Sequence, residues 1–135
     1  MRQRNVRGFT LVETLIAAGL IAMSALSLVF VFTAARGAND TARRISFATL
    51  LAVDKMEHLR ALPFDDAALE PSPPEALTAD VPDYSDRPAA GYSRRWSITP
   101  LASNPAQAVV IEVLVRSQRG SADARLIAVK ARKAG

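Results

Sequence analysis

A single carboxylate stands in the longest apolar stretch of the chain. Residues 9–35 contain one ionisable side chain, Glu13. A charged group near the centre of a bilayer costs about 2.5–3.5 kcal/mol, so it normally needs a partner or access to water. Physics alone leaves two interpretations open. Either the Glu13 carboxylate reaches the lipid headgroups from about one turn inside the helix, or it has a charged partner.

The stretch has the length and composition of a membrane span. At about 1.5 Å per residue, a helix over residues 9–35 crosses a hydrocarbon layer of about 30 Å. Three arginines within residues 1–8 favour a cytoplasmic amino terminus, although three more within residues 36–44 weaken that asymmetry. Cleavage of an ordinary signal peptide near Ala35 is the alternative. The apolar part of such a peptide is shorter, about 7–15 residues.

The residues in front of this stretch have the pattern of a processing junction. The run RGFTLVE at residues 7–13 resembles the leader-peptide junction of type IV prepilins and type II secretion pseudopilins. The resemblance extends over the apolar helix that follows. It implies that a prepilin peptidase cuts after Gly8 and methylates the new amino-terminal residue, Phe9. It also implies that Glu13 neutralises the terminal amine of a neighbouring subunit during filament assembly.

This pairing is consistent with ordinary electrostatics. A terminal amine has an unperturbed pKa of about 7.7–8.0 and stays largely charged at neutral pH. Pairing it with a carboxylate offsets part of the cost of burying both groups. Cleavage would remove three of the 17 Lys and Arg residues, and the remainder nearly balances the 13 Asp and Glu residues. The net charge of +4 therefore reflects topology and processing, and we expect no nucleic-acid partner.

Few other residues offer chemistry. His58 is the single histidine, and without a second nitrogen or sulfur ligand we interpret it as a solvated helical residue. Asp80, Asp83 and Asp86 recur at three-residue steps and are candidate calcium ligands, but a calcium loop normally has a denser set of oxygen ligands. We therefore favour a soluble turn-rich loop there. The chain has no Cys and no phosphate-binding or hydrolase motif, so we predict neither an enzyme nor a cofactor.

Residues 36–62 predict a continuation of the helix beyond the membrane. No proline occurs before Pro63, and good helix-forming residues dominate. Gly19 and Gly37 are predicted weak points at which the helix could bend, each costing roughly 1 kcal/mol relative to Ala. One face of the continuation is apolar at three- and four-residue steps and is expected to pack on a sheet. Its members are Ile45, Ala48, Ala52, Met56 and Leu59.

The remaining residues predict a small head. Residues 63–91 hold most of the prolines and show little apolar periodicity, so we predict a long loop that carries partner specificity. Trp96 is expected to anchor the core because it lies in phase with the apolar face of a strand. Residues 92–135 therefore predict an antiparallel sheet over the helix. The three predicted strands are residues 92–98, 108–116 and 125–131.

These elements predict an α+β, pilin-like fold, in which a long N-terminal membrane-spanning helix packs on a small antiparallel β-sheet. The segments are a leader at 1–8, an apolar assembly helix at 9–35, its amphipathic continuation at 36–62, a proline-rich loop at 63–91 and the sheet at 92–135. The short head, the lack of Cys and the run ATLLAVDKME at residues 48–57 resemble minor pilins and small minor pseudopilins.

The resemblance implies a structural function. A subunit of this kind assembles through its N-terminal helix into a type IV pilus or a type II secretion pseudopilus and primes assembly at the tip. The implied partners are prepilin peptidase, other pilin or pseudopilin subunits, the inner-membrane assembly platform and the lipid bilayer. The implied location is the bacterial inner membrane, crossed once with the head in the periplasm, and then the filament. The alternative is a membrane-anchored periplasmic binding or sensory module that keeps residues 1–8 and does not polymerise.

Overall fold

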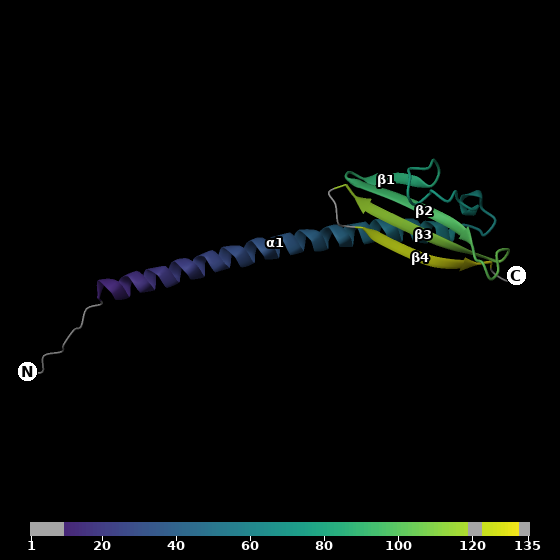
Figure 1. The fold of residues 1–135 in the computed structure, drawn as a ribbon. Helices are drawn as coiled ribbons and strands as arrows, with labels where there is room; N and C mark the ends of the chain where they lie inside the picture. The colour runs from purple at the N-terminus through teal and green to yellow at the C-terminus, as the bar shows by residue number, and fades with distance from the viewer. Residues whose placement is uncertain (1–9, 119–122, 133–135) are drawn as a thin grey trace, which may run out of the picture. The chain divides into compact units, whose positions relative to one another are not determined.

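The structure is a computed structural model that describes residues 10–118 and 123–132. The chain divides between Asn39 and Asp40 into two compact units, each considered by itself below. One helix, α1 (Leu11–Ala61), contributes to both (Figure 1). It begins after Thr10, whose Oγ1 accepts a hydrogen bond from the Glu13 N–H at 3.3 Å. It ends one residue before the Leu62-Pro63 step, because the residue before a proline disfavours helical geometry.

The first unit contains the apolar half of α1. Its described large apolar side chains are exposed, and Phe30 retains 81% of its accessible surface. The helix is continuous through Gly19 and Gly37, and bending at these glycines on packing into a filament stays a prediction. Of the described residues, α1 alone is long and apolar enough to cross a membrane. This half of the helix thus has no internal partner for its apolar surface.

The second unit contains a four-stranded antiparallel sheet in the order β1-β2-β3-β4 (Figure 1). The strands are β1 (Ser85–Ala89), β2 (Tyr92–Pro100), β3 (Ala108–Ser117) and β4 (Ala124–Ala131). The α+β fold and the three predicted strands are confirmed. The prediction of a loop over residues 63–91 is wrong in part, because β1 lies within this range. The sequence SDRPA of β1 has no apolar alternation and contains a proline, which is tolerated on an edge strand.

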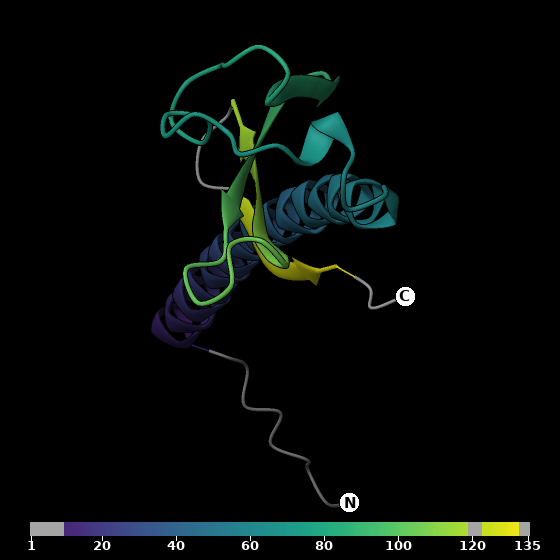
Figure 2. The same cartoon turned by 90° about the vertical axis from the view of Figure 1, so that its right-hand side faces the viewer.

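The core lies between one face of the sheet and the second half of α1 (Figure 2). Four of the five helical residues predicted to face the sheet are buried: Ala48, Ala52, Met56 and Leu59. The prediction for Ile45 is wrong, since 43% of its surface is exposed. Trp96 is a core residue as predicted. From the sheet, the most deeply buried side chains are Ile98, Ile111, Val113 and Val115.

The segment between α1 and β1 is held against β2 by backbone hydrogen bonds. The Ser72 N–H donates to the Ile98 carbonyl at 2.9 Å, and the Trp96 N–H donates to the Tyr84 carbonyl at 3.0 Å. A short 3-10 helix, η1 (Ala67–Leu69), buries Leu69 in the core. The segment therefore extends the edge of the sheet that β1 occupies. It is a packed part of the head and not a free loop.

Candidate functional site

The predicted processing junction lies at the start of α1. Gly8 and Phe9 fall outside the described residues, so their roles as cleavage site and methylated residue stay predictions. The first described residue, Thr10, caps the helix through its side-chain oxygen. Thr10 and Glu13 have the spacing of a capping box, in which a hydroxyl and a carboxylate satisfy free N–H groups of the first turn. The local sequence thus begins a helix directly after the junction.

Glu13 occupies the first turn of α1 and is exposed. A carboxylate near a helix N-terminus interacts favourably with the helix dipole, by about 0.3–1 kcal/mol at a solvated position. Within residues 10–118 and 123–132, no Lys, Arg or His nitrogen lies within 4.0 Å of its carboxylate. The helix dipole therefore favours Glu13 at this position within a single chain. Its carboxylate remains available to a charged group from outside the described residues.

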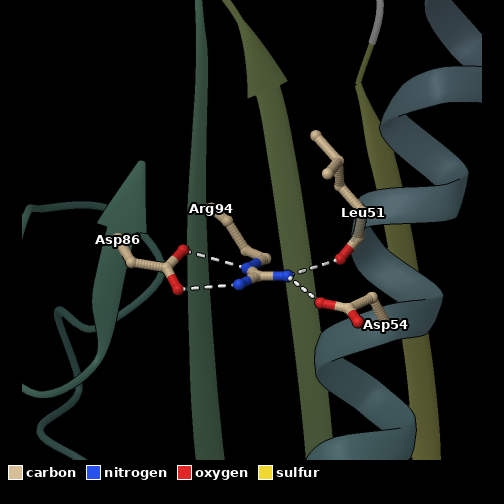
Figure 3. A network of polar contacts seen from close by, with 4 residues as sticks. All are labelled: Leu51, Asp54, Asp86 and Arg94. Carbon is tan, nitrogen blue, oxygen red and sulfur yellow. Dashed lines mark hydrogen bonds and ion pairs between the residues drawn. The ribbon is translucent and has the colours of Figure 1, made fainter. Parts of the chain in front are cut away.

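In the head, a buried arginine joins β1, β2 and α1 (Figure 3). Arg94 of β2 is 7% exposed and makes a two-pronged contact with Asp86 of β1, at 2.9 Å from Nε and 2.8 Å from Nη2. Its Nη1 donates to Asp54 Oδ2 at 3.0 Å and to the Leu51 carbonyl at 2.8 Å, both on α1. Burial by itself would lower the pKa of Arg94, but the hydrogen bonds to Asp86 and Asp54 outweigh it and raise the pKa.

Sequence reasoning missed this cluster. Arg94 lies on the apolar face of β2, in phase with Trp96 and Ile98, and a charge at such a position signals a buried ion pair. The identity of its partners was not readable, since Asp54 lies 40 residues away in the chain. Beside the cluster, Lys55 Nζ lies 3.6 Å from the centre of the Trp96 ring, and burial lowers the pKa of Lys55. These contacts hold β1 and β2 against the second half of α1.

A lysine closes the end of the helix. Lys130 of β4 donates to the carbonyls of Leu59 at 3.1 Å and Arg60 at 3.0 Å, and also to that of Leu62. The last carbonyls of a helix have no partner inside the helix, and a cation there also interacts favourably with the negative end of the helix dipole. This contact joins β4 to the C-terminal end of α1.

Two of the three aspartates considered as calcium ligands are paired with arginines. Asp80 pairs with Arg95, with 2.8 Å between Oδ1 and Nη2, and Asp86 binds Arg94. Asp80 and Asp86 are therefore each paired with an arginine. His58 is exposed near the end of α1, as expected. Across the part of the chain that the structure describes, no three His, Asp or Glu side chains gather closely enough to hold a metal ion.

A comparison with protein-family models gives one finding. Residues 3–29 match the model described as the prokaryotic N-terminal methylation motif. The chain carries a type IV prepilin-like signal. The match spans the predicted junction, Glu13 and much of the exposed apolar helix, and it leaves the head unassigned. No curated protein and no solved structure matched the chain in the two other comparisons. The signal and the α+β fold are consistent with a pilin-like precursor.

Proposed function

We propose that the chain is a prepilin-like filament subunit, cut between Gly8 and Phe9, methylated on Phe9 and assembled through the first half of α1. The observation that carries this proposal is the coincidence of the methylation motif at residues 3–29 with a helix whose apolar side chains are exposed on all sides. An apolar surface of this extent is covered by lipid or by other protein. A subunit that passes from membrane to filament uses both coverings in turn.

The exchange of lipid for neighbouring helices needs a signal for the correct register. Lipid tails and leucine side chains are similarly apolar, so apolar contact alone discriminates poorly between registers. A charged pair between Glu13 and the amine of Phe9 in a neighbouring subunit supplies this discrimination. Leaving either charge buried and unpaired penalises the wrong register by about 3–5 kcal/mol. The exposed carboxylate of Glu13 in the first turn supports this role.

The finer assignment follows from the size of the head. We place the chain among the minor pilins or minor pseudopilins, which prime assembly near the filament tip. The head, residues 40–135, is small and has no described metal or catalytic cluster. The partners are prepilin peptidase, other pilin or pseudopilin subunits, the inner-membrane assembly platform and the bilayer. The chain crosses the bacterial inner membrane once, with the head in the periplasm until assembly.

The decisive experiment has two readouts on the same cells. Mass spectrometry of the amino terminus tests processing, and the expected mature chain begins with N-methylated Phe9. Sheared filaments test incorporation, which we expect Glu13→Ala to reduce by roughly tenfold or more while processing stays intact. Glu57→Ala is the matched control, an exposed glutamate in the head half of the same helix. An intact Met1 in the wild type would instead identify a membrane tether, and normal incorporation of Glu13→Ala would remove the role of Glu13.

A further inference from the structure

The strand β4 forms one edge of the sheet, and part of its backbone points away from β3 (Figure 1). The Arg132 N–H donates to the Gln107 carbonyl at 2.7 Å, one step beyond the Ala108–Ala131 pair that ends the β3–β4 register. Antiparallel partners alternate between pairs that exchange both hydrogen bonds and pairs that exchange none. Every second residue of β4 therefore directs its N–H and C=O groups away from β3. These outward residues are Arg125, Ile127, Val129 and Ala131.

This outward row is uncovered in the head. Within residues 10–118 and 123–132, the main chain of the four outward residues forms no hydrogen bond outside the pairing with β3. Ile127 and Val129 are 60% and 56% exposed, and among the described strand residues they are the only exposed large apolar side chains. An extended strand is the backbone conformation that pairs with such a row of donors and acceptors.

The two edges of the sheet differ in how they are protected. The strand β1 contains Pro88, and its register with β2 shifts between Asp86 and Ala89, which are features that hinder pairing with a further strand. The strand β4 contains no proline and pairs with β3 without a shift. The Lys130 amine, which could guard the edge with its charge, is bound to carbonyls of α1. The edge at β4 is therefore open to a further strand.

A hollow of about 420 Å³ adjoins this edge where α1 ends. Leu62 and Phe64 line it together with Val129. On the face of β4 that packs toward the core, Leu126 and Ala128 are only half-buried. The side chains of a strand alternate between the two faces of a sheet, so a strand added to β4 would direct every second side chain toward α1. The hollow gives one such side chain an apolar place to pack.

The basic side chains along and beside this edge already have partners. These contacts are Arg125 with Glu112, Lys130 with the carbonyls at the end of α1, Arg132 with Asp65 and Arg60 with Glu57. The four cations therefore do not call for an acidic group from outside. The exposed Ile127 and Val129 and the apolar lining of the hollow favour an uncharged, apolar strand.

We propose that the outward edge of β4 pairs with an extended apolar strand of a different filament subunit. This inference rests on the proposed function, in which the neighbours of a minor subunit near the tip are other subunits. Hydrogen bonds to the four outward residues hold the added strand, and the hollow beside Phe64 selects its inward side chain. The pairing uses one edge of the head and ends there, because β1 at the other edge is blocked.

Photo-cross-linking in the full-length chain tests this contact. A benzophenone amino acid in place of Ile127 marks the outward edge. The same group in place of the exposed Thr99, on the same face of the sheet but on β2, is the matched control. In sheared filaments we expect the Ile127 position to cross-link to a different subunit on the order of tenfold more than the Thr99 position. Mass spectrometry of the linked peptide identifies the partner.

Two substitutions at one residue separate strand pairing from side-chain contact. Val129→Pro removes an outward N–H that β3 does not use, and edge strands tolerate proline at such positions. It should lower the Ile127 cross-link roughly tenfold, because the added strand loses a donor and meets the proline ring. Val129→Thr keeps the N–H and the β-branched shape and should leave the yield within about twofold. Ala131→Pro makes the same backbone change at the last residue of β4.

The outcomes distinguish the two proposals, with leader cleavage and protease resistance of the head measured for every variant. If the wild-type chain is absent from filaments, the assembly function and this inference both fall. If the chain is incorporated, the strand pairing alone is wrong when the Ile127 position gives no cross-link, links only to a second copy of this chain or is insensitive to both proline substitutions. Unfolding of the head in both proline variants would mean that the head itself uses these N–H groups, and would also overturn the pairing.

Discussion

The two halves of α1 have the same backbone conformation and opposite surroundings. From Leu11 to Asn39 the helix exposes leucine, isoleucine, valine and phenylalanine, whereas from Asp40 to Ala61 it buries one face against a sheet. At the centre of that face stand two alanines, Ala48 and Ala52, which are fully buried. Small residues let a helix lie close to the sheet, and large exposed ones require an external partner. Helical structure alone thus does not say which half is a core and which is an interface.

The largest expected effect comes from truncating the same residue type in each half. Leu59→Ala removes a side chain that is 1% exposed and should lower the free energy of unfolding of the head by about 2–5 kcal/mol, because it leaves a cavity. Leu20→Ala lies in the exposed half and should change that free energy by less than about 0.5 kcal/mol. Denaturant unfolding in detergent, followed by the fluorescence of Trp96, measures both. A large loss in the Leu20 variant would contradict the division of α1.

Removing the charge that joins the head to α1 should have the next largest effect. Arg94→Met keeps the length of the side chain but leaves Asp86 and Asp54 without their partner. We expect a loss of about 1–3 kcal/mol and faster hydrogen exchange in β1, since β1 is a short strand at the edge of the sheet. Arg95→Met is the matched control. Its partner Asp80 is about half exposed, so the loss should stay within about 1 kcal/mol.

Glycine substitution tests whether the junction between the two halves is a flexible point. A Cβ added at Gly37 meets no atom within 4 Å, so Gly37→Ala should stabilise the helix locally by up to about 1 kcal/mol. Slower hydrogen exchange around residue 37 would show this. If the same variant lowers incorporation into filaments, the helix needs the flexibility that glycine provides. Unchanged exchange would contradict any local weakness at this position.

The smallest effect concerns pH. Burial lowers the pKa of Lys55 below its usual 10.5, so between the lowered value and 10.5 the unfolded chain binds more protons than the folded one. The free energy of unfolding therefore gains a contribution as pH rises through this window. Lys55→Gln should abolish that contribution, measured as the difference between wild type and variant at pH 8 and pH 10. An identical pH dependence in the two proteins would show that Lys55 is solvated in the folded head.

Patterns that repeat within a few residues were predictable from the sequence. The apolar run and the position of Glu13 follow directly from the residue types. The alternation of β2 and β3 and the buried face at Ala48, Ala52 and Met56 have a local period that reports which side faces the core. The methylation motif at residues 3–29 was recognisable for a related reason, since it is a run of contiguous residues. The start of the helix after Thr10 also depends on nearby residues, because the Thr10 side chain accepts a hydrogen bond from the Glu13 N–H.

Contacts between residues far apart in the chain were decided by the tertiary structure. The strand β1 has no strand-like pattern and exists because β2 offers it an edge and Arg94 binds its Asp86. Ile45 follows the period of the buried face, yet the sheet does not cover it. The capping of α1 by Lys130 joins groups about 70 residues apart. The sequence by itself determined the long helix, its apolar run and three of the four strands, because periodicity is local. Which charges are paired depends on distances that exist only after folding.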